Sequence, residues 1–269
     1  MTRLAANLTM MFTELPFLDR FGAAAQAGFK AVECVSPYVA DAELIAEYLR
    51  RHDLTLVLFN LPPGDWDKGD RGFAANPARK EEFRASVATA LDYARATGCR
   101  KLHLMAGKIT PGADRRIWES TLIDNVILAA DAVKDDGITI VLEPINTRVD
   151  IPGYFYDTTA AALQVIAAAG RANVKLLYDI YHMQIMEGDI ARTIERLLPS
   201  IGHVQLADNP GRHEPGTGEI NYAWLLPRLD ELGYDGWVGC EYKPATSTDA
   251  GLSWAAPYLG QGSQTGDDA

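Results

Sequence analysis

The stretch GITIVLE, residues 137–143, is a short apolar run, rich in β-branched residues, that ends on a glutamate. Short runs of this kind, bounded by polar or turn residues, are typical of buried strands. Seven similar runs recur along the chain, at residues 4–10, 30–35, 54–60, 100–105, 174–179, 202–207 and 237–242. The sequence therefore predicts eight strands.

The segments between these runs have the features of helices. Residues 40–52 and 189–200 carry apolar side chains at three- and four-residue spacing, which places them on one helical face. Residues 76–97 begin with an Asn-Pro cap and stop before a glycine, as helices commonly do. Strands that alternate with helices pair in parallel through right-handed crossovers.

Eight such units in 269 residues, roughly 34 residues each, predict an α/β protein with a single-domain (β/α)8 barrel, the TIM barrel. We expect the barrel to span residues 1–258, followed by a disordered polar tail at 259–269. An open, doubly wound sheet is the alternative, but no GxGxxG motif follows any of the runs.

The charge and the apolar content of the chain disfavour two classes of partner, nucleic acids and membranes. The formal net charge of −11 disfavours nucleic-acid binding, which needs basic patches. No stretch approaches the roughly 18 apolar residues of a membrane span, and the first residues do not read as a signal peptide. The three cysteines, Cys34, Cys99 and Cys240, lie in or beside apolar runs, as packing thiols do in a reducing compartment. We therefore expect a cytoplasmic protein with no nucleic-acid or membrane partner.

Four polar residues stand at the ends of four consecutive runs: Glu143, Asp179, Gln205 and Glu241. Barrel enzymes build their sites at the carboxyl ends of strands, and neighbouring strands lie about 4.8 Å apart. Three carboxylates and one amide oxygen suit a hard cation such as Mg²⁺ or Mn²⁺. Without a cation, converging carboxylates repel one another. A single acid at a strand end is commonly a turn residue or a helix cap, but four donors on four consecutive strands predict a metal site.

At these residues the sequence resembles the hydroxypyruvate isomerase family of xylose-isomerase-like barrels. The resemblance extends from residue 5 to about residue 255, and the matching stretches are AANLTMMF, NLPPGDWDKGDRG, EPIN, DIPGY, YDIYHMQIMEGD, HVQLADNPGRHEPGTGEINY and GWVGCEYKP. It implies that Glu143, Asp179, Gln205 and Glu241 hold a divalent metal and that Glu143 and Glu241 form the catalytic acid/base pair. Related sugar epimerases carry histidine where this chain has Gln205, which favours the isomerases of small hydroxy acids.

The reaction implied by the resemblance is hydroxypyruvate ⇌ 2-hydroxy-3-oxopropanoate (tartronate semialdehyde), a step of glyoxylate metabolism. One glutamate would remove a proton from C3 and the other return one to C2, through a metal-stabilised cis-enediolate. A hydride shift between the carbons stays open. The substrate is itself a carboxylate and needs a cationic or hydrogen-bonding partner. The candidates are His182, Arg212, His103, Lys108 and Arg71.

Several alternatives remain. An isomerase of a four-carbon acid, a dehydrotetronate, would share these motifs and differ in the pocket loops. A ketose 3-epimerase is disfavoured by Gln205. A metal-dependent endonuclease on the same barrel would need several histidines and a basic face, whereas this chain has five histidines and a charge of −11. A non-catalytic sugar-binding protein would not need two opposed glutamates. A homo-oligomer is one alternative for the assembly.

Overall fold

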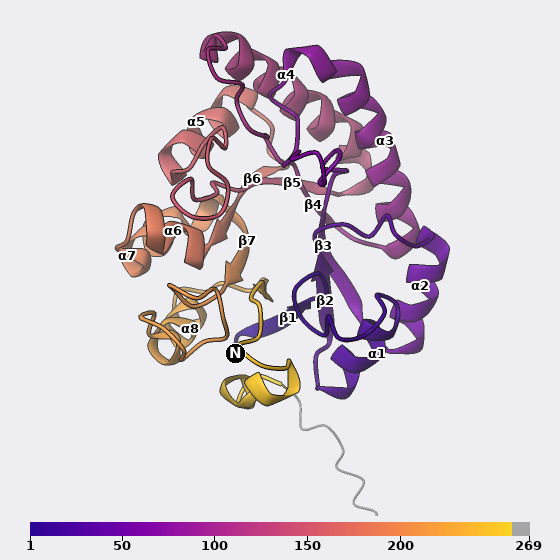
Figure 1. Cartoon of the computed structure of the whole chain (residues 1–269), viewed down its shortest axis with the longest axis vertical. Helices are drawn as coiled ribbons and strands as arrows, with labels where there is room; N and C mark the ends of the chain where they lie inside the picture. The colour runs from indigo at the N-terminus through magenta and orange to yellow at the C-terminus, as the bar shows by residue number, and fades with distance from the viewer. Residues whose placement is uncertain (260–269) are drawn as a thin grey trace, which may run out of the picture.

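Eight parallel strands form a closed barrel in the computed structural model, which describes residues 1–259 (Figure 1). Each strand pairs with the next, and β1 pairs with β8 to close the ring. The strands are β1 (Arg3–Asn7), β2 (Ala31–Cys34), β3 (Thr55–Asn60), β4 (Lys101–His103), β5 (Thr139–Leu142), β6 (Val174–Asp179), β7 (Ile201–Leu206) and β8 (Trp237–Cys240). The predicted (β/α)8 barrel is confirmed. The predicted tail lies, apart from its first residue, outside the described residues.

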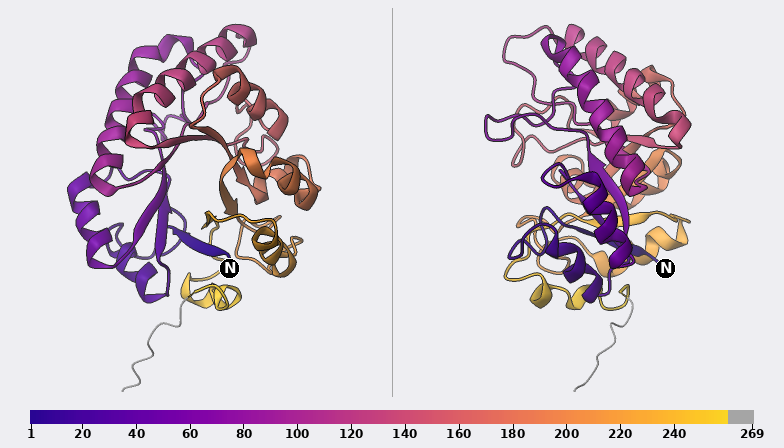
Figure 2. Two further views of the ribbon diagram at one scale, coloured as in Figure 1. Left: turned by 180° about the vertical axis from the view of Figure 1, so that it is seen from behind. Right: turned by 90° about the vertical axis from the view of Figure 1, so that its right-hand side faces the viewer.

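The helices surround the strand ring (Figures 1 and 2). They are α1 (Asp19–Gln26), α2 (Ala42–Arg51), α3 (Lys80–Thr97), α4 (Arg115–Val133), α5 (Thr159–Ala169), α6 (Ile180–Met186), α7 (Ile190–Leu197) and α8 (Tyr222–Glu231), with 3-10 turns at Pro77–Arg79, Lys134–Asp136, Leu198–Ser200, Asp249–Gly251 and Ser253–Ala255. None of these helices is long and apolar enough to cross a membrane. Their apolar faces pack on the outside of the barrel and form its main core.

The predicted helix at residues 76–97 shows how local sequence sets these elements. The Asn76 side chain accepts a hydrogen bond from the Ala78 amide at 3.0 Å, and the Pro77–Arg79 turn leads directly into α3. The helix ends where Gly98 takes a left-handed conformation, with φ of 73°. The cap and stop signals of the sequence are both used.

Some strands are shorter than predicted, because turns begin early at their carboxyl ends. β1 stops at Asn7, whose carbonyl accepts from the amides of Met10 and Met11 at 3.1 and 2.8 Å. β5 and β8 stop at Leu142 and Cys240. The next residue in each case is one of the predicted glutamates, and the Glu241 amide still donates to the Leu206 carbonyl of β7 at 3.0 Å.

The long loops gather at the carboxyl end of the barrel, on the left of the right-hand view in Figure 2. The loop at residues 61–76 packs tightly on the end of β4, where Gly72 forms an isolated bridge with Ala106. A Cβ atom on Gly72 would lie 2.3 Å from that of Met105, and its φ is +83°. Only glycine fits both conditions, and this close approach forms one wall of the site.

Candidate metal and substrate site

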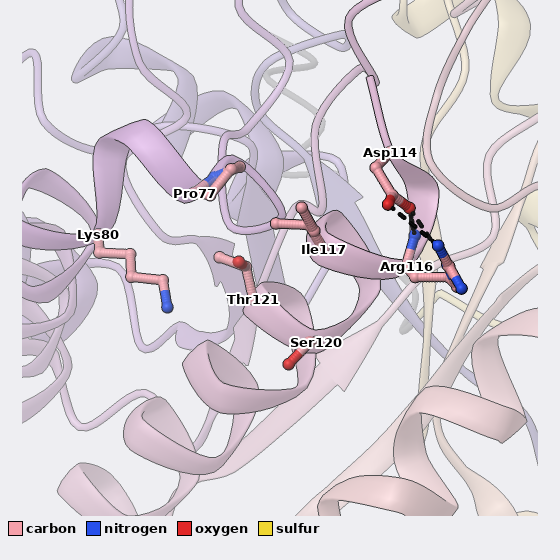
Figure 3. A pocket seen from close by; sticks show the side chains of 7 residues that line it. All are labelled: Pro77, Lys80, Asp114, Arg116, Ile117, Ser120 and Thr121. Carbon is pink, nitrogen blue, oxygen red and sulfur yellow. Dashed lines mark hydrogen bonds and ion pairs between the residues drawn. The ribbon is translucent and has the colours of Figure 1, made fainter. Parts of the chain in front are cut away.

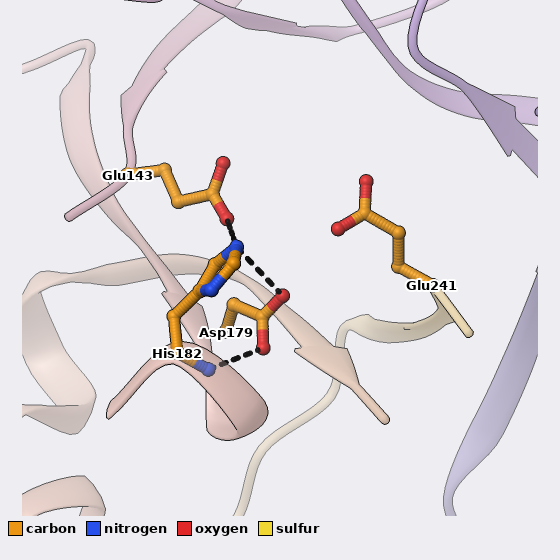
Figure 4. Close-up of side chains that lie close together, drawn as sticks. All are labelled: Glu143, Asp179, His182 and Glu241. Atoms are coloured by element: carbon orange, nitrogen blue, oxygen red, sulfur yellow. Dashed lines mark hydrogen bonds and ion pairs between the residues drawn. The ribbon is translucent and has the colours of Figure 1, made fainter. Parts of the chain in front are cut away.

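The four predicted strand-end residues meet at the carboxyl end of the barrel. Asp179, Gln205 and Gly239 are register partners on β6, β7 and β8, so these strand ends lie at one level. Glu143 and Glu241 follow β5 and β8 directly. Glu143, Asp179, His182 and Glu241 each offer one ligand atom, and these atoms lie within 4.8 Å of one another. Glu241 faces the other three from the far side (Figure 4).

Within the described residues, three buried oxygen atoms at these strand ends have no hydrogen-bond partner: Glu143 Oε1, Asp179 Oδ2 and Gln205 Oε1. A buried polar atom without a partner costs about 1–3 kcal/mol, so three in one place indicate a ligand. The second oxygen of Asp179 is used differently, because Oδ1 accepts from the amides of Tyr181 and His182 and caps α6. One carboxylate thus starts a helix and keeps one oxygen for a ligand. This donor set fits a divalent cation.

The electrostatics of the metal-free cluster also favour a cation. Burial, together with the charges of Glu241 and Asp179, raises the pKa of Glu143 well above its ordinary value. Burial raises the pKa of Glu241 to about 8, although Arg212 opposes that shift. Carboxylates held this way retain protons near neutral pH unless positive charge is supplied.

Two buried histidines flank Glu143. His103 Nδ1 lies 3.5 Å from Glu143 Oε2, and His182 Nε2 lies 3.5 Å from Glu143 Oε1. Burial lowers the pKa of His103 to about 3 and that of His182 to about 4, so both rings are neutral. These contacts are therefore polar contacts rather than ion pairs.

The tautomer of His182 bears on whether it is a ligand. Asn146 Nδ2 donates to His182 Nδ1 at 2.7 Å, because Asn146 Oδ1 already accepts from the Val149 and Asp150 amides. The ring proton is then on Nε2, which points to Glu143 and to Asp179 (Figure 4). A protonated Nε2 donates and has no lone pair for a metal. The geometry therefore favours Gln205 Oε1 as the fourth ligand and leaves His182 as a hydrogen-bond donor.

Arg212 joins two loops to the cluster, because its guanidinium binds both Asp150, in the loop after β5, and Glu241. Its Nη2 donates to Glu241 Oε2 and its Nη1 to Asp150 Oδ1, both at 2.7 Å, and its side chain is 15% exposed. Among residues 1–259, the buried Nε atom of Arg212 has no hydrogen-bond partner. The guanidinium thus offsets part of the carboxylate charge and keeps one donor unused.

The loop that carries Arg212 is organised by one aspartate. Asp208 Oδ1 accepts from the amides of Asn209 and Ile220, and Oδ2 accepts from those of Gly216 and Gly218. Four amides on one buried carboxylate hold the 208–220 loop in a fixed shape, with Arg212 in a left-handed conformation at φ of 54°. This loop at residues 208–220, here called the rim loop, brings the Arg212 guanidinium to Glu241.

A cavity of about 1070 Å³ opens above the cluster. Its inner wall includes Glu143, His182, Arg212 and Glu241, and its outer part includes Trp66 and Arg71. Arg71 stacks on the Trp66 ring at 3.7 Å and donates to two carbonyls of its own loop. Among the candidates for the substrate carboxylate, His182, Arg212 and Arg71 therefore line the cavity, and His103 contacts Glu143 without lining it.

Lys108 is the candidate that the structure does not bring to the site. It is exposed, is not among the residues that line the cavity, and forms a backbone bridge with Tyr154. This bridge pairs the loop after β4 with the loop after β5. Lys108 was a candidate only because it follows a strand end, and the pairing of the two loops determines its position instead.

Two site residues are absent from the sequence prediction. Asp150 binds Arg212, Asn146 and Tyr181 from the loop after β5. Glu33 is fully buried on β2 and contacts Gln205. An acid inside the apolar run KAVECV is a signal that could have identified Glu33. Asp150 is the first residue of the matching stretch DIPGY, but nothing in that stretch indicates its contact with Arg212.

A second hollow lies on the outside of the barrel, between the start of α3 and the first turns of α4 (Figure 3). It is lined by Pro77, Lys80, Asp114, Arg116, Ile117, Ser120 and Thr121. Its one acid, Asp114, is engaged with Arg116 and caps α4. The chemistry of the chain therefore lies at the barrel mouth.

Comparison with known sequences agrees with this architecture. Residues 21–258 match the family model of the xylose isomerase-like TIM barrel. The chain is 48% identical to 2-oxo-tetronate isomerase of Cupriavidus necator, over 97% of this chain and all of that protein. It is also 48% identical to hydroxypyruvate isomerase of Escherichia coli, over 96% of this chain and all of that protein.

Comparison with solved structures gives the same fold. A Brucella melitensis protein described as AP endonuclease, family 2, superposes with a TM-score of 0.94 at 51% identity, over 97% of this chain and all of the other. A D-allulose 3-epimerase from Methylomonas sp. gives 0.72 at 22% identity, covering 96% of this chain and 91% of that one, which shows the fold alone. The chain belongs to the xylose isomerase-like TIM barrel family.

Proposed function

We propose that the chain is a metal-dependent isomerase that interconverts hydroxypyruvate and 2-hydroxy-3-oxopropanoate. The observation that carries this proposal is the pair Glu143 and Glu241, two buried carboxylates that face each other across a centre lined by unpartnered oxygens. A full-length similarity to hydroxypyruvate isomerase supports it. The proposed ligands are Glu143, Asp179, Gln205 and Glu241, with Mg²⁺ or Mn²⁺ as the cation.

The isomerisation moves one carbon-bound proton. One glutamate takes a proton from C3 of the ketone, and the other returns a proton to C2, while a hydroxyl proton passes between the two oxygens. Burial raises the pKa of both carboxylates above its ordinary value, and a raised pKa lets a carboxylate hold a proton as well as accept one. A bound Mg²⁺ or Mn²⁺ supplies positive charge beside the oxygens on which negative charge develops. His182 Nε2–H points toward the same centre and can donate to a substrate oxygen.

The amide of Gln205 makes the proposed site less negative toward an anionic substrate than a fourth carboxylate would. Three carboxylates, one neutral amide and a dication sum to −1, whereas a fourth carboxylate in place of Gln205 would give −2. Arg212 adds one positive charge at the cavity wall, and its free Nε–H can bind the substrate carboxylate. Arg71 is another of the cations that line the cavity and is the candidate for the far end of a longer acid.

A four-carbon acid is the second candidate substrate. The similarity to 2-oxo-tetronate isomerase equals that to hydroxypyruvate isomerase, and a cavity of about 1070 Å³ has room for the extra carbon. An endonuclease activity, suggested by the description of the Brucella relative, is not favoured. The chain carries a charge of −11, and among residues 1–259 the metal-binding group contains a single histidine. Cys34, Cys99 and Cys240 are buried and unpaired, as in a reducing compartment such as the cytoplasm.

A turnover panel tests this function. Protein treated with EDTA and dialysed is incubated with hydroxypyruvate, 2-oxo-tetronate or D-fructose, with and without added Mg²⁺ or Mn²⁺, and products are followed by NMR. We expect no turnover without metal, restored turnover with either ion, and the highest kcat/KM for hydroxypyruvate. Turnover of 2-oxo-tetronate alone would refute the substrate assignment. Metal-independent turnover, or none with either acid, would refute the proposed function.

A further inference from the structure

We infer that Glu33 is a positioning residue that turns the amide oxygen of Gln205 toward the metal centre. The inference rests on the proposed metal site and does not depend on the identity of the substrate. Glu33 lies on β2, faces the barrel interior and is fully buried. It is not one of the strand-end residues and offers no atom to the group around Glu143.

The carboxylate of Glu33 collects three side-chain donors. Its Oε1 accepts from Gln205 Nε2 at 2.7 Å and from Asn7 Nδ2 at 3.0 Å. Its Oε2 lies 2.7 Å from His203 Nε2. A carboxylate is an acceptor only, so the amide of Gln205 can approach it with the nitrogen end and not with the oxygen end.

This contact decides what Gln205 presents on its other side. With Nε2 engaged by Glu33, Oε1 is buried without a partner and is free to bind a cation. A reversed amide would place its oxygen against the Glu33 carboxylate and its N–H groups toward Asp179, the register partner of Gln205. Without Glu33 the reversed orientation of the Gln205 amide is favoured, because its N–H groups can then donate to the Asp179 carboxylate. Such a site would offer a cation three ligands and two N–H donors.

The barrel makes room for this carboxylate on β8, which is separated from β2 only by β1. Gly239 on β8 is the register partner of Gln205. A Cβ atom at Gly239 would lie 2.2–2.4 Å from the carboxylate atoms of Glu33, so a side chain there would displace Glu33. Three strands thus determine the position of Glu33: β2 carries it, β7 supplies its partner Gln205, and β8 leaves space for it at Gly239. Residues that orient metal ligands in this way typically change metal affinity about 10–100-fold when they are replaced.

Two conservative variants of Glu33 distinguish its role in orienting Gln205 from the effect of its negative charge. Glu33→Asp keeps the negative charge but withdraws the oxygens by one methylene, so the contact with Gln205 is lost. Glu33→Gln loses the charge but keeps an oxygen at the same reach, since His203 can change tautomer to match the new N–H group. Positioning therefore predicts that Mn²⁺ binding, measured by calorimetry, weakens about 10–100-fold in E33D and changes by less than about threefold in E33Q.

His203→Gln is the matched control, because it alters another partner of the same carboxylate and leaves the Gln205 contact in place. We expect H203Q to bind Mn²⁺ within about threefold of the wild type. Unfolding of the metal-free variants is measured in parallel, so that lost stability is not mistaken for lost affinity. Wild-type affinity in E33D, or a tenfold loss in E33Q, would overturn the inference. If the wild type itself bound no Mn²⁺, the proposed function would fail instead.

Discussion

Replacing Glu143 with glutamine is expected to lower kcat for hydroxypyruvate by about 10⁴-fold, the upper end of what a positioned proton-transfer group contributes. Glutamine has nearly the same shape and keeps one oxygen for the metal, but it cannot take up a proton. Glu143 Oε1 is buried in the cluster without a hydrogen-bond partner, and the neutral ring of His182 lies 3.5 Å away. Asp179 is held by its cap of α6 and Glu241 by Arg212, so neither carboxylate is expected to replace Glu143. Steady-state kinetics at saturating Mn²⁺ measure this loss.

Glu219→Gln is the control for Glu143→Gln. Glu219 is an exposed residue of the rim loop that accepts from Asn209 and Gln184, and its replacement should leave kcat unchanged. If E143Q retained more than about a tenth of the wild-type kcat, where general acid–base catalysis contributes at least about 10²-fold, the assignment of Glu143 to proton transfer would be wrong.

Arg212→Met is expected to lower kcat/KM by about 10²–10³-fold, mainly through KM. Truncating one partner of a buried, hydrogen-bonded charge pair costs about 2–5 kcal/mol, and each 1.36 kcal/mol is about tenfold in rate. Arg212 is bound to both Glu241 and Asp150, and its free Nε–H is the proposed contact for the substrate carboxylate. Methionine fills similar space without charge. Kinetics that resolve kcat from KM, together with thermal unfolding, measure the effect.

Lys243→Met provides the comparison for Arg212→Met. Lys243 lines the same cavity but is exposed, so its charge is screened by solvent and its loss should change KM little. An R212M enzyme with an unchanged KM would contradict the carboxylate-binding role. Arg212 would then act only by holding Glu241 in place through their hydrogen bond.

Much of the barrel could be predicted from the sequence, because its pattern is local. Eight apolar, β-branched runs with helical segments between them define the strands, and parallel connectivity places their carboxyl ends together. The same argument brought Glu143, Asp179, Gln205 and Glu241 to one end of the barrel, where the structure has them. The resemblance to hydroxypyruvate isomerases is confirmed by the family model and by full-length similarity.

The parts that escaped prediction depend on contacts between distant segments. Glu33 and Gln205 are 172 residues apart, and Arg212 and Asp150 are 62 apart. Neither pair has a spacing that marks it. Lys108 follows a strand end like the proposed metal ligands, but its loop is bridged to Tyr154 and it does not line the cavity. The orientation of an amide or an imidazole is likewise set by its neighbours, which no single sequence displays.

The central claim is that one divalent cation is held by oxygens from four consecutive strands, and anomalous diffraction from Mn²⁺-loaded crystals tests it most directly. The account predicts one anomalous peak in the barrel mouth, coordinated by Glu143, Asp179, Glu241 and the amide oxygen of Gln205, with His182 Nε2 outside the coordination shell. A peak coordinated by His182 in place of Gln205, or no peak within this group of residues, would contradict it.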